Sequence, residues 1–259
     1  MRIIVLVKEV PDTAGDRRLD PVDKTVFRDG SDPIINPLDE LALEEAIRLV
    51  ESDGGEVTTL TIGPSGSEES IRKALAMGAD EAIHVTDDAL HGACVMQTAR
   101  VVAAALRTLE WDLVIAGSEA TDSRMSVLPV LVADSLAVPS LTFARKLTVG
   151  GSELTIERTH ESGFTTVSAE LPAVVSVVDK INDPRYPSFK GIMAAKKKVI
   201  ETRSLGDLGL DPADFGPESA STVVRSFRDA PARAAGRTVT DDGGGGVQLA
   251  DYLASMKFI

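Results

Sequence analysis

Short apolar runs that alternate with amphipathic segments are the strongest constraint on the fold of this chain. The runs at 3–7, 57–62, 82–85 and 112–117 are strand-length, and the segments between them repeat apolar residues at helical spacing. Such runs are typical of parallel strands that are covered by helices on both faces. The pattern therefore predicts an α/β fold with an open, mostly parallel sheet.

Two of the intervening segments carry signals for where a helix begins and ends. Asn36 and Pro37 have the pattern of an N-cap followed by proline at the first helical position. Ser65 and Glu68 have the spacing of a capping box, and Gly78 can end the helix that follows them. We expect helices that start at these two places.

The second half of the chain has a different period. Residues 141–170 alternate with a period of two around two glycine turns, which predicts antiparallel strands added to the sheet. Beyond Lys198 the apolar pattern weakens, and the chain ends in an amphipathic segment. We expect an α/β core at 1–184, a loop with a basic helix at 185–204 and an extended C-terminal arm at 205–259.

Composition excludes several classes of function. The net charge is −13, so we expect no nucleic-acid partner, because such proteins present basic surfaces. Cys94 is the single cysteine and the three histidines are scattered, so we expect no disulfide and no metal site. The apolar N-terminal run is too short to span a membrane and lacks a signal-peptide pattern, so we expect a cytoplasmic protein without membrane insertion.

Motifs of catalysis are missing from the sequence. It contains no dinucleotide-binding glycine fingerprint, no Walker A loop and no G-x-S-x-G elbow. Acidic residues are plentiful, but Asp39, Glu40, Glu44 and Glu45 are expected to form the solvent face of a helix. His84 lies inside an apolar run and is expected to be a strand residue. We therefore assign no catalytic residue.

The segment 117–128 runs from a strand end through small and polar residues into an apolar helix. In open α/β sheets, ligands bind at the carboxyl ends of strands, where helix N-termini favour phosphate. Asp122 and Ser123 are expected to cap the helix, with backbone N–H groups left for a phosphate. The alternative is an ordinary strand-to-helix turn with a polar cap.

The stretch 181–198 combines prolines, aromatic residues and three consecutive lysines on an acidic chain. A surface loop with a basic helix end would explain the lysines through the helix dipole. Phe189, however, is surrounded by polar and small residues, and aromatic anchors in such settings are a common partner-binding design. A docking loop is the second interpretation.

Taken together, these segments resemble the beta subunit of electron transfer flavoprotein. The resemblance rests on VLVKEVPDT, INPLDELALEEAIRL, IRKALAMGAD, DLVIAGSEATD and LPAVVSVVDKINDPRYPSFKGIMAAKKK, in family order. It implies an adenine-nucleotide-binding, Rossmann-like core in a heterodimer with an alpha subunit. Such a carrier takes electrons from flavin dehydrogenases, such as acyl-CoA dehydrogenases, to a quinone oxidoreductase of the respiratory chain. FAD is held mainly by the alpha subunit at the interface, and the beta subunit binds a structural AMP.

The resemblance also assigns roles to residues of this chain. Arg124 is expected to contact the AMP phosphate in a loop where relatives have glycine, and Thr13 is expected to lie near the flavin. The residues expected around the nucleotide are Leu6, Asn36, Pro37, Leu38, Asp39, Ile62, Gly117, Ser118, Glu119, Ala120, Thr121, Asp122, Ser123, Arg124, Met125 and Ser126. Those expected to dock the dehydrogenase are Arg185, Tyr186, Phe189, Ile192 and Met193. The arm 205–259 is expected to wrap the alpha subunit.

Three other functions remain open at this point. A bifurcating relative would hold a second FAD, in place of AMP, that exchanges electrons with NADH. A stand-alone adenine-nucleotide-binding protein would be a monomer with an ATP site, although no glycine-rich phosphate loop is visible. A docking module without any ligand would be insensitive to changes at Asp122.

Overall fold

The computed structural model describes residues 1–15, 17–28, 30–231, 236 and 238–259. The strands are β1 (Arg2–Leu6), β2 (Glu9–Pro11), β3 (Pro33–Ile35), β4 (Glu56–Ile62), β5 (Glu81–Val85), β6 (Leu113–Gly117), β7 (Ser140–Gly150), β8 (Glu153–His160), β9 (Gly163–Glu170), β10 (Ala173–Val177) and β11 (Ile200–Arg203). The helices are α1 (Pro37–Asp53), α2 (Glu68–Met77), α3 (Val95–Arg107), α4 (Leu128–Leu136), α5 (Phe189–Ala195) and α6 (Gly245–Ser255). Short 3₁₀ turns occur at η1 (Ser65–Ser67), η2 (Asp88–Leu90), η3 (Gly206–Leu208) and η4 (Pro212–Asp214).

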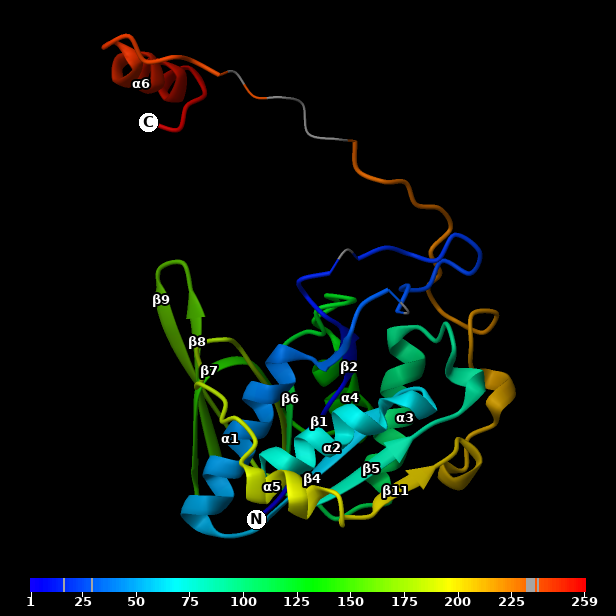
Figure 1. The fold of residues 1–259 in the computed structure, drawn as a ribbon. Coiled ribbons are helices and arrows are strands. Elements are labelled where there is room, and N and C mark those ends of the chain that lie inside the picture. The colour runs from blue at the N-terminus through cyan, green and yellow to red at the C-terminus, as the bar shows by residue number, and fades with distance from the viewer. Residues whose placement is uncertain (16, 29, 232–235, 237) are drawn as a thin grey trace. The chain divides into compact units, whose positions relative to one another are not determined.

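One large sheet organises the fold (Figure 1). Its strand order is β11-β5-β4-β1-β6-β10-β7-β8-β9, with parallel pairing except for the antiparallel pairs β7–β8 and β8–β9. From β1 the chain moves outward through β4 and β5, and it then returns to place β6 on the other side of β1. This reversal creates a topological switch point between β1 and β6, where open α/β sheets bind ligands.

Helices cover both faces of the sheet, as the apolar runs predict. Ile3 and Val5 of β1 point into one core with α1 and α2, while Ile4 and Leu6 point into a second core with α3 and α4. Alternating side chains of one strand thus serve two cores, because successive strand residues face opposite sides. The α/β architecture with added antiparallel strands at 141–170 is confirmed.

The predicted helix boundaries are partly confirmed. Helix α1 begins at Pro37 and α2 ends at Gly78, whose φ of 140° suits glycine alone. The capping box at Ser65 and Glu68 is wrong, because η1 precedes the helix and α2 itself begins at Glu68 without a side-chain cap. The extra 3₁₀ turn moves the N-cap position from Ser65 to Ser67.

Acidic residues of α1 also differ from expectation. Asp39, Glu44 and Glu45 are buried, with exposed fractions of 6%, 6% and 9%, instead of forming a solvent face. Each of these carboxylates accepts hydrogen bonds from a segment distant in sequence. Buried carboxylates require such partners, since an unpaired buried charge is strongly destabilising.

The chain beyond the predicted core continues to pack against the sheet. Strand β11 pairs in parallel with β5, and Leu205 and Phe215 are buried in the second core. The chain divides into a unit at Met1–Arg225 and a separate unit at Ser226–Ile259 that contains α6. Of the expected arm, residues 232–235 and 237 lie outside the described residues. No described helix is both long and apolar enough to cross a membrane.

Candidate nucleotide site and docking surface

The carboxyl ends of three adjacent strands bring predicted site residues together. Leu6 ends β1, Ile62 ends β4 and Gly117 ends β6, and these strands are neighbours in the sheet. Asn36 precedes α1, which packs against β6. The residues around the switch point are therefore contributed by segments far apart in the sequence.

Asn36 joins the start of α1 to the segment after β6. Its side-chain amide donates to Glu119 O at 2.9 Å, and its Oδ1 accepts from Thr121 N at 3.0 Å. The side chain is fully buried and makes no capping bond to its own helix. Asn36 is the N-cap residue of α1, as predicted, but its side chain fixes the loop 117–128 against α1 instead of capping the helix.

Asp39 is the buried acceptor at the centre of this arrangement. Its carboxylate accepts from Asn36 Nδ2 at 2.9 Å, Lys8 N at 2.9 Å and Gly117 N at 3.2 Å. Burial raises the pKa of Asp39 to about 7, and the hydrogen bonds from Asn36, Lys8 and Gly117 only partly oppose this. One side chain thus ties together the ends of β1 and β6 and the first turn of α1.

Gly117 allows this close approach. A Cβ at this position would lie 2.5 Å from Asp39 Oδ1 and 2.7 Å from Leu38 Cβ. These separations are shorter than any tolerated contact, so a side chain would push α1 away from β6. Glycine is required here by space, which explains its place at the strand end.

Asp122 has a different role from the predicted one. Its side chain is 2% exposed and accepts from Lys8 Nζ at 2.8 Å and Arg28 Nη2 at 2.7 Å. Burial opposes ionisation, but the two cations outweigh it and hold the pKa of Asp122 below its ordinary value. The prediction that Asp122 and Ser123 cap the next helix is wrong, because α4 begins at Leu128 after Val127.

The backbone after Asp122 takes an unusual conformation. Arg124 and Ser126 have φ values of 49° and 54°, in the left-handed region that non-glycine residues rarely occupy. The N–H groups of Met125, Ser126 and Val127 donate to no acceptor within the described part of the chain. Strained loops with consecutive free N–H groups are typical of anion-binding sites.

Two side chains of this loop have polar groups that are unpaired or only loosely paired. The Thr121 hydroxyl is buried and has no hydrogen-bond partner among the residues described. The Arg124 side chain is 66% exposed, and its guanidinium lies 3.9 Å from Glu119 Oε1, which is a loose pair. Glu119 also accepts from Ser126 Oγ at 3.1 Å. The loop therefore offers a cation, free amides and a hydroxyl, which suit a nucleotide phosphate and ribose.

The remaining predicted nucleotide residues lie around the same loop at different depths. Ser118 is buried, Ala120 is half-buried, and Ser123 and Met125 are exposed. Pro37 and Leu38 are half-buried in the first turn of α1. Thr13, the residue expected near the flavin, is exposed in the loop between β2 and β3.

Three basic residues next to the site were missed by the sequence reasoning. Lys8 and Arg28 bind Asp122, and Arg17 Nη1 donates to Thr121 O at 2.5 Å. Lys8 could have been found, since it lies two residues after the end of β1 at the ligand-binding edge. Arg17 and Arg28 lie in a long loop without any periodic signal. They hold that loop against the segment 119–124.

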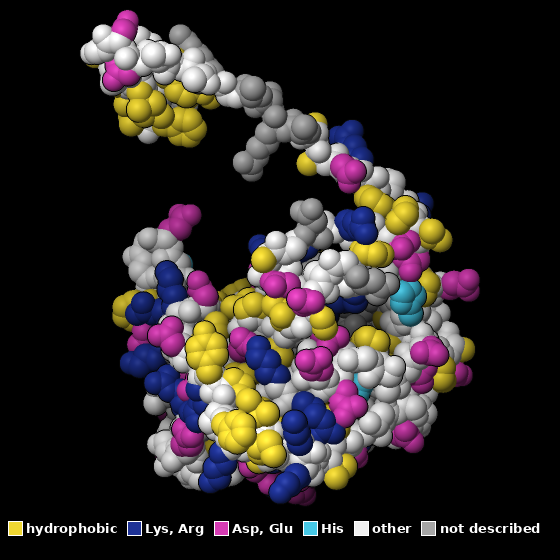
Figure 2. Space-filling model, viewed as in Figure 1, with side chains coloured by type: hydrophobic (Ala, Val, Ile, Leu, Met, Phe, Trp, Pro, Cys, Tyr) yellow, Lys and Arg dark blue, Asp and Glu magenta, His cyan; other side chains and the backbone are white. Residues whose placement is uncertain are grey.

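A second surface gathers exposed apolar side chains around α5. We define the docking patch as Tyr186, Phe189, Ile192 and Met193, which are 95%, 81%, 41% and 46% exposed. Figure 2 shows hydrophobic side chains gathered over the area of α5 and the preceding loop, with Lys and Arg side chains nearby. Large exposed apolar groups in such a cluster are typical of interaction sites.

Comparison with known proteins gives the family of the chain. A family model described as the electron transfer flavoprotein domain matches residues 24–208. The electron transfer flavoprotein subunit beta of Mycobacterium tuberculosis is 45% identical, over 99% of each chain. That of Thermoanaerobacterium thermosaccharolyticum is 40% identical over 86% of each. The caffeyl-CoA reductase-Etf complex subunit CarD of Acetobacterium woodii is 36% identical, over 93% of this chain and 92% of CarD.

The match extends over nearly the whole chain and includes the β1–β6 edge and the docking patch. It agrees with the α/β architecture that was derived independently from the strand and helix pattern. The resemblance predicted from the sequence motifs is therefore confirmed, and the chain belongs to the family of electron transfer flavoprotein beta subunits.

Proposed function

We propose that this chain is the beta half of a heterodimeric electron carrier in the cytoplasm. It pairs with an alpha subunit that holds most of the FAD, accepts electrons from flavin dehydrogenases such as acyl-CoA dehydrogenases, and passes them to a quinone oxidoreductase. The chain itself carries no catalytic residue. Its tasks are to bind AMP as a structural ligand, to face the flavin with the loop that contains Thr13, and to dock the dehydrogenase.

The arrangement at the switch point supports AMP as the ligand. Loop 117–128 combines the free amides of Met125, Ser126 and Val127 with the exposed Arg124 guanidinium and the unpaired Thr121 hydroxyl. A nucleotide monophosphate needs these donors, because its phosphate carries the charge and its ribose the hydroxyls. AMP would contribute charge and hydrogen bonds that stabilise the left-handed backbone of the loop, without taking part in electron transfer.

The exposure of the docking patch is the observation that carries the proposed role as a carrier. Phe189 is 81% exposed at the start of α5, although a phenyl ring in a stable monomer is normally buried. A protruding ring fits an apolar pocket on a partner, and transient electron-transfer contacts need only a small interface. We assign Phe189 as the apolar anchor of the dehydrogenase interface.

Truncation of this ring tests the assignment. In the heterodimer, Phe189→Ala is expected to raise the apparent KM for the carrier about 30-fold or more, because interface anchors contribute about 2 kcal/mol or more. In the assay, an acyl-CoA dehydrogenase with excess acyl-CoA reduces the carrier, and the carrier reduces a dye. The rate is measured as the carrier concentration is varied. Flavin content and heterodimer assembly are expected to stay at wild-type levels.

Phe164→Ala is the matched control for this experiment. Phe164 is also an exposed phenylalanine, at 56%, but it lies on the edge strand β9. The control is expected to leave the KM unchanged. An unchanged KM in Phe189→Ala, with flavin intact, would remove the docking role.

A second candidate function is favoured by one comparison. The relative from Acetobacterium woodii is named as a subunit of a caffeyl-CoA reductase complex. By analogy, this chain would hold a second FAD in place of AMP and exchange electrons with NADH. The identity of the nucleotide bound by this chain separates the two proposals.

A further inference from the structure

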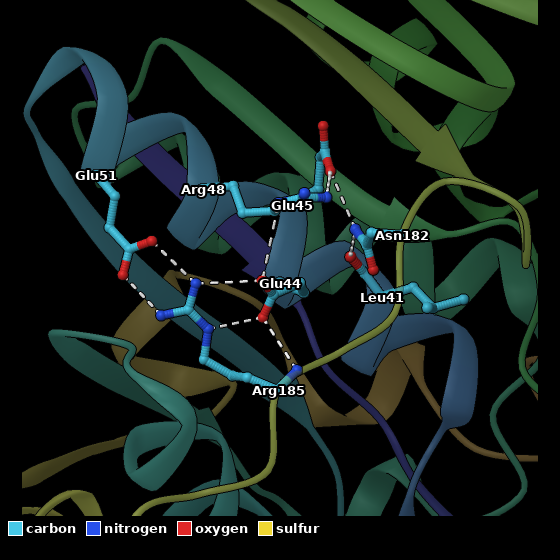
Figure 3. Close-up of polar contacts among 7 residues, drawn as sticks. All are labelled: Leu41, Glu44, Glu45, Arg48, Glu51, Asn182 and Arg185. Carbon is cyan, nitrogen blue, oxygen red and sulfur yellow. Dashed lines mark hydrogen bonds and ion pairs between the residues drawn. The ribbon is translucent and has the colours of Figure 1, made fainter.

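Arg185 belongs to the predicted docking set, but its side chain forms ion pairs with glutamates of the same chain. Its guanidinium donates to Glu44 at 2.8 and 3.1 Å and to Glu51 at 2.6 and 2.9 Å, as Figure 3 shows. Its backbone N–H also donates to Glu44, at 3.1 Å. The planar fork of arginine thus binds two carboxylates bidentately, a geometry that lysine cannot reproduce.

The two glutamates are placed for this contact by helix geometry. Glu44 and Glu51 are seven residues apart in α1, so both side chains project from the same face two turns apart. Glu44 is buried, and its other cation, Arg48, lies 4.0 Å away. Hydrogen bonds to Glu51 and Glu44 raise the pKa of Arg185 above its ordinary value. The Glu44 carboxylate therefore depends on Arg185 as its close partner.

A second bond from the same segment reinforces this anchor. Asn182 Nδ2 donates to Leu41 O at 3.1 Å and to Glu45 Oε2 at 3.0 Å (Figure 3). Asn182 and Arg185 therefore fasten the start of the loop along one face of α1. This use of Glu44 and Glu45 explains why both are buried although the helix pattern predicts them on the solvent face.

The far end of the docking segment is fastened to a different helix. Helix α5 packs against α2 so closely that a Cβ on Gly191 would lie 2.4 Å from Ala76 O. Arg72 of α2 donates to Ala195 O at 2.9 Å and to Lys198 O at 3.1 Å. The stretch 186–190, which ends in the first two residues of α5, therefore lies between an anchor on α1 and an anchor on α2.

We propose that Arg185 is a positioning residue for dehydrogenase docking, whose ion pairs with Glu44 and Glu51 hold Tyr186 and Phe189 in a preformed, protruding arrangement. This inference rests on the proposed docking function. Two fixed ends leave the stretch 186–190 few conformations, so little order has to be gained when a partner binds. Preorganisation of this kind lowers the cost of association.

Substitution of Arg185 tests the positioning role in the intact heterodimer. Arg185→Gln is expected to raise the apparent KM for the carrier about tenfold with kcat unchanged, if the presenting conformation falls to about one tenth of the population. Arg185→Lys keeps the positive charge but loses the planar guanidinium, so its apparent KM is expected to lie between those of wild type and Arg185→Gln. Adding Glu51→Gln to Arg185→Gln is expected to cause no further rise, because both changes break the same contact.

Hydrogen exchange supplies a readout that does not depend on the dehydrogenase. The backbone amides of residue 185 and of Gly191, which donate to Glu44 and to Ser188 Oγ in the wild type, are expected to exchange about tenfold faster in Arg185→Gln than in wild type, and at the wild-type rate in Phe189→Ala. Arg48→Gln is the matched control, since it removes an arginine of α1 whose contacts with Glu44 and Glu45 are loose, at 4.0 and 3.9 Å, and leaves the short bonds between Arg185 and Glu44 in place. The control is expected to change neither the KM nor the exchange.

The outcomes separate the positioning role from the docking function. If Phe189→Ala raises the KM while Arg185→Gln leaves both KM and exchange at wild-type values, positioning by Arg185 is wrong and docking stands. If Phe189→Ala leaves the KM unchanged, the docking function itself is wrong. If Arg48→Gln raises the KM as much as Arg185→Gln, positive charge and not loop position governs the encounter, and the inference is overturned.

Discussion

Replacement of Gly117 by alanine is the most informative single perturbation of the site. The new Cβ would lie 2.5 Å from Asp39 Oδ1, 2.7 Å from Leu38 Cβ and 2.9 Å from Leu38 C. Overpacking of this kind costs about 1–3 kcal/mol. The displaced carboxylate also loses the hydrogen bond from Gly117 N, and bonds to charged groups contribute about 1.5–3 kcal/mol. Taking the lower part of the second range for a 3.2 Å bond, we expect a loss of about 3 kcal/mol.

Denaturant unfolding followed by the fluorescence of Trp111 measures this loss. Trp111 is the single tryptophan, and its Nε1 donates to Leu106 O at 3.1 Å, so unfolding changes its environment. The expected loss corresponds to a fall in Tm of about 6–12 °C for a unit of this size. Gly66→Ala is the control, because a Cβ there meets nothing within 4 Å. A Gly117→Ala variant within about 0.5 kcal/mol of wild type would refute the proposed close approach of α1 and β6.

Two further predictions concern the pKa of Asp39 and the packing of α5 against α2. The pKa of Asp39 is raised from 3.8 to about 7 in the folded protein, so between these pH values the native state retains a proton that the unfolded chain has lost. The contribution of Asp39 to the free energy of unfolding therefore falls as pH rises from 4 to 7, by up to about 1.4 kcal/mol per pH unit. Asp39→Asn removes this term, so the difference between the two unfolding free energies is expected to vary across that pH range; a constant difference would contradict the raised pKa. Gly191→Ala, whose Cβ would lie 2.4 Å from Ala76 O, is expected to displace α5 and speed hydrogen exchange at 192–196, and unchanged exchange would argue against tight packing on α2.

The parts of the fold that the sequence predicts are those set by local pattern. The strand at β1 follows from its apolar run, and the start of α1 follows from Pro37 at the first helical position. The antiparallel strands follow from a period of two between glycine turns. In each case a neighbouring residue, and not a distant one, decides the structure.

The parts that the sequence does not predict are decided by distant contacts. Glu44 is buried because Arg185 reaches it from 141 residues away, and no local signal marks that pair. Asp122 binds Arg28, which lies 94 residues earlier, and is therefore not a cap of α4. The short strand β11 forms because β5 offers a free edge, although its own sequence is weakly apolar.

In the candidate site, too, some features follow from the sequence pattern and others do not. The position of the ligand edge follows from strand order, since Leu6 and Gly117 end adjacent parallel strands. The left-handed conformations at Arg124 and Ser126 could not be expected, because such positions normally require glycine. They place this part of the loop beyond what a local sequence pattern can predict.

We propose that this chain holds AMP in a heterodimer that carries a single flavin. This proposal is tested most directly by releasing the small molecules from the purified complex by heat and determining their masses and their ratios to protein. We expect one FAD and one AMP per heterodimer, with the AMP lost in Gly117→Ala. Two FAD and no AMP would contradict it and would assign the chain to the bifurcating type.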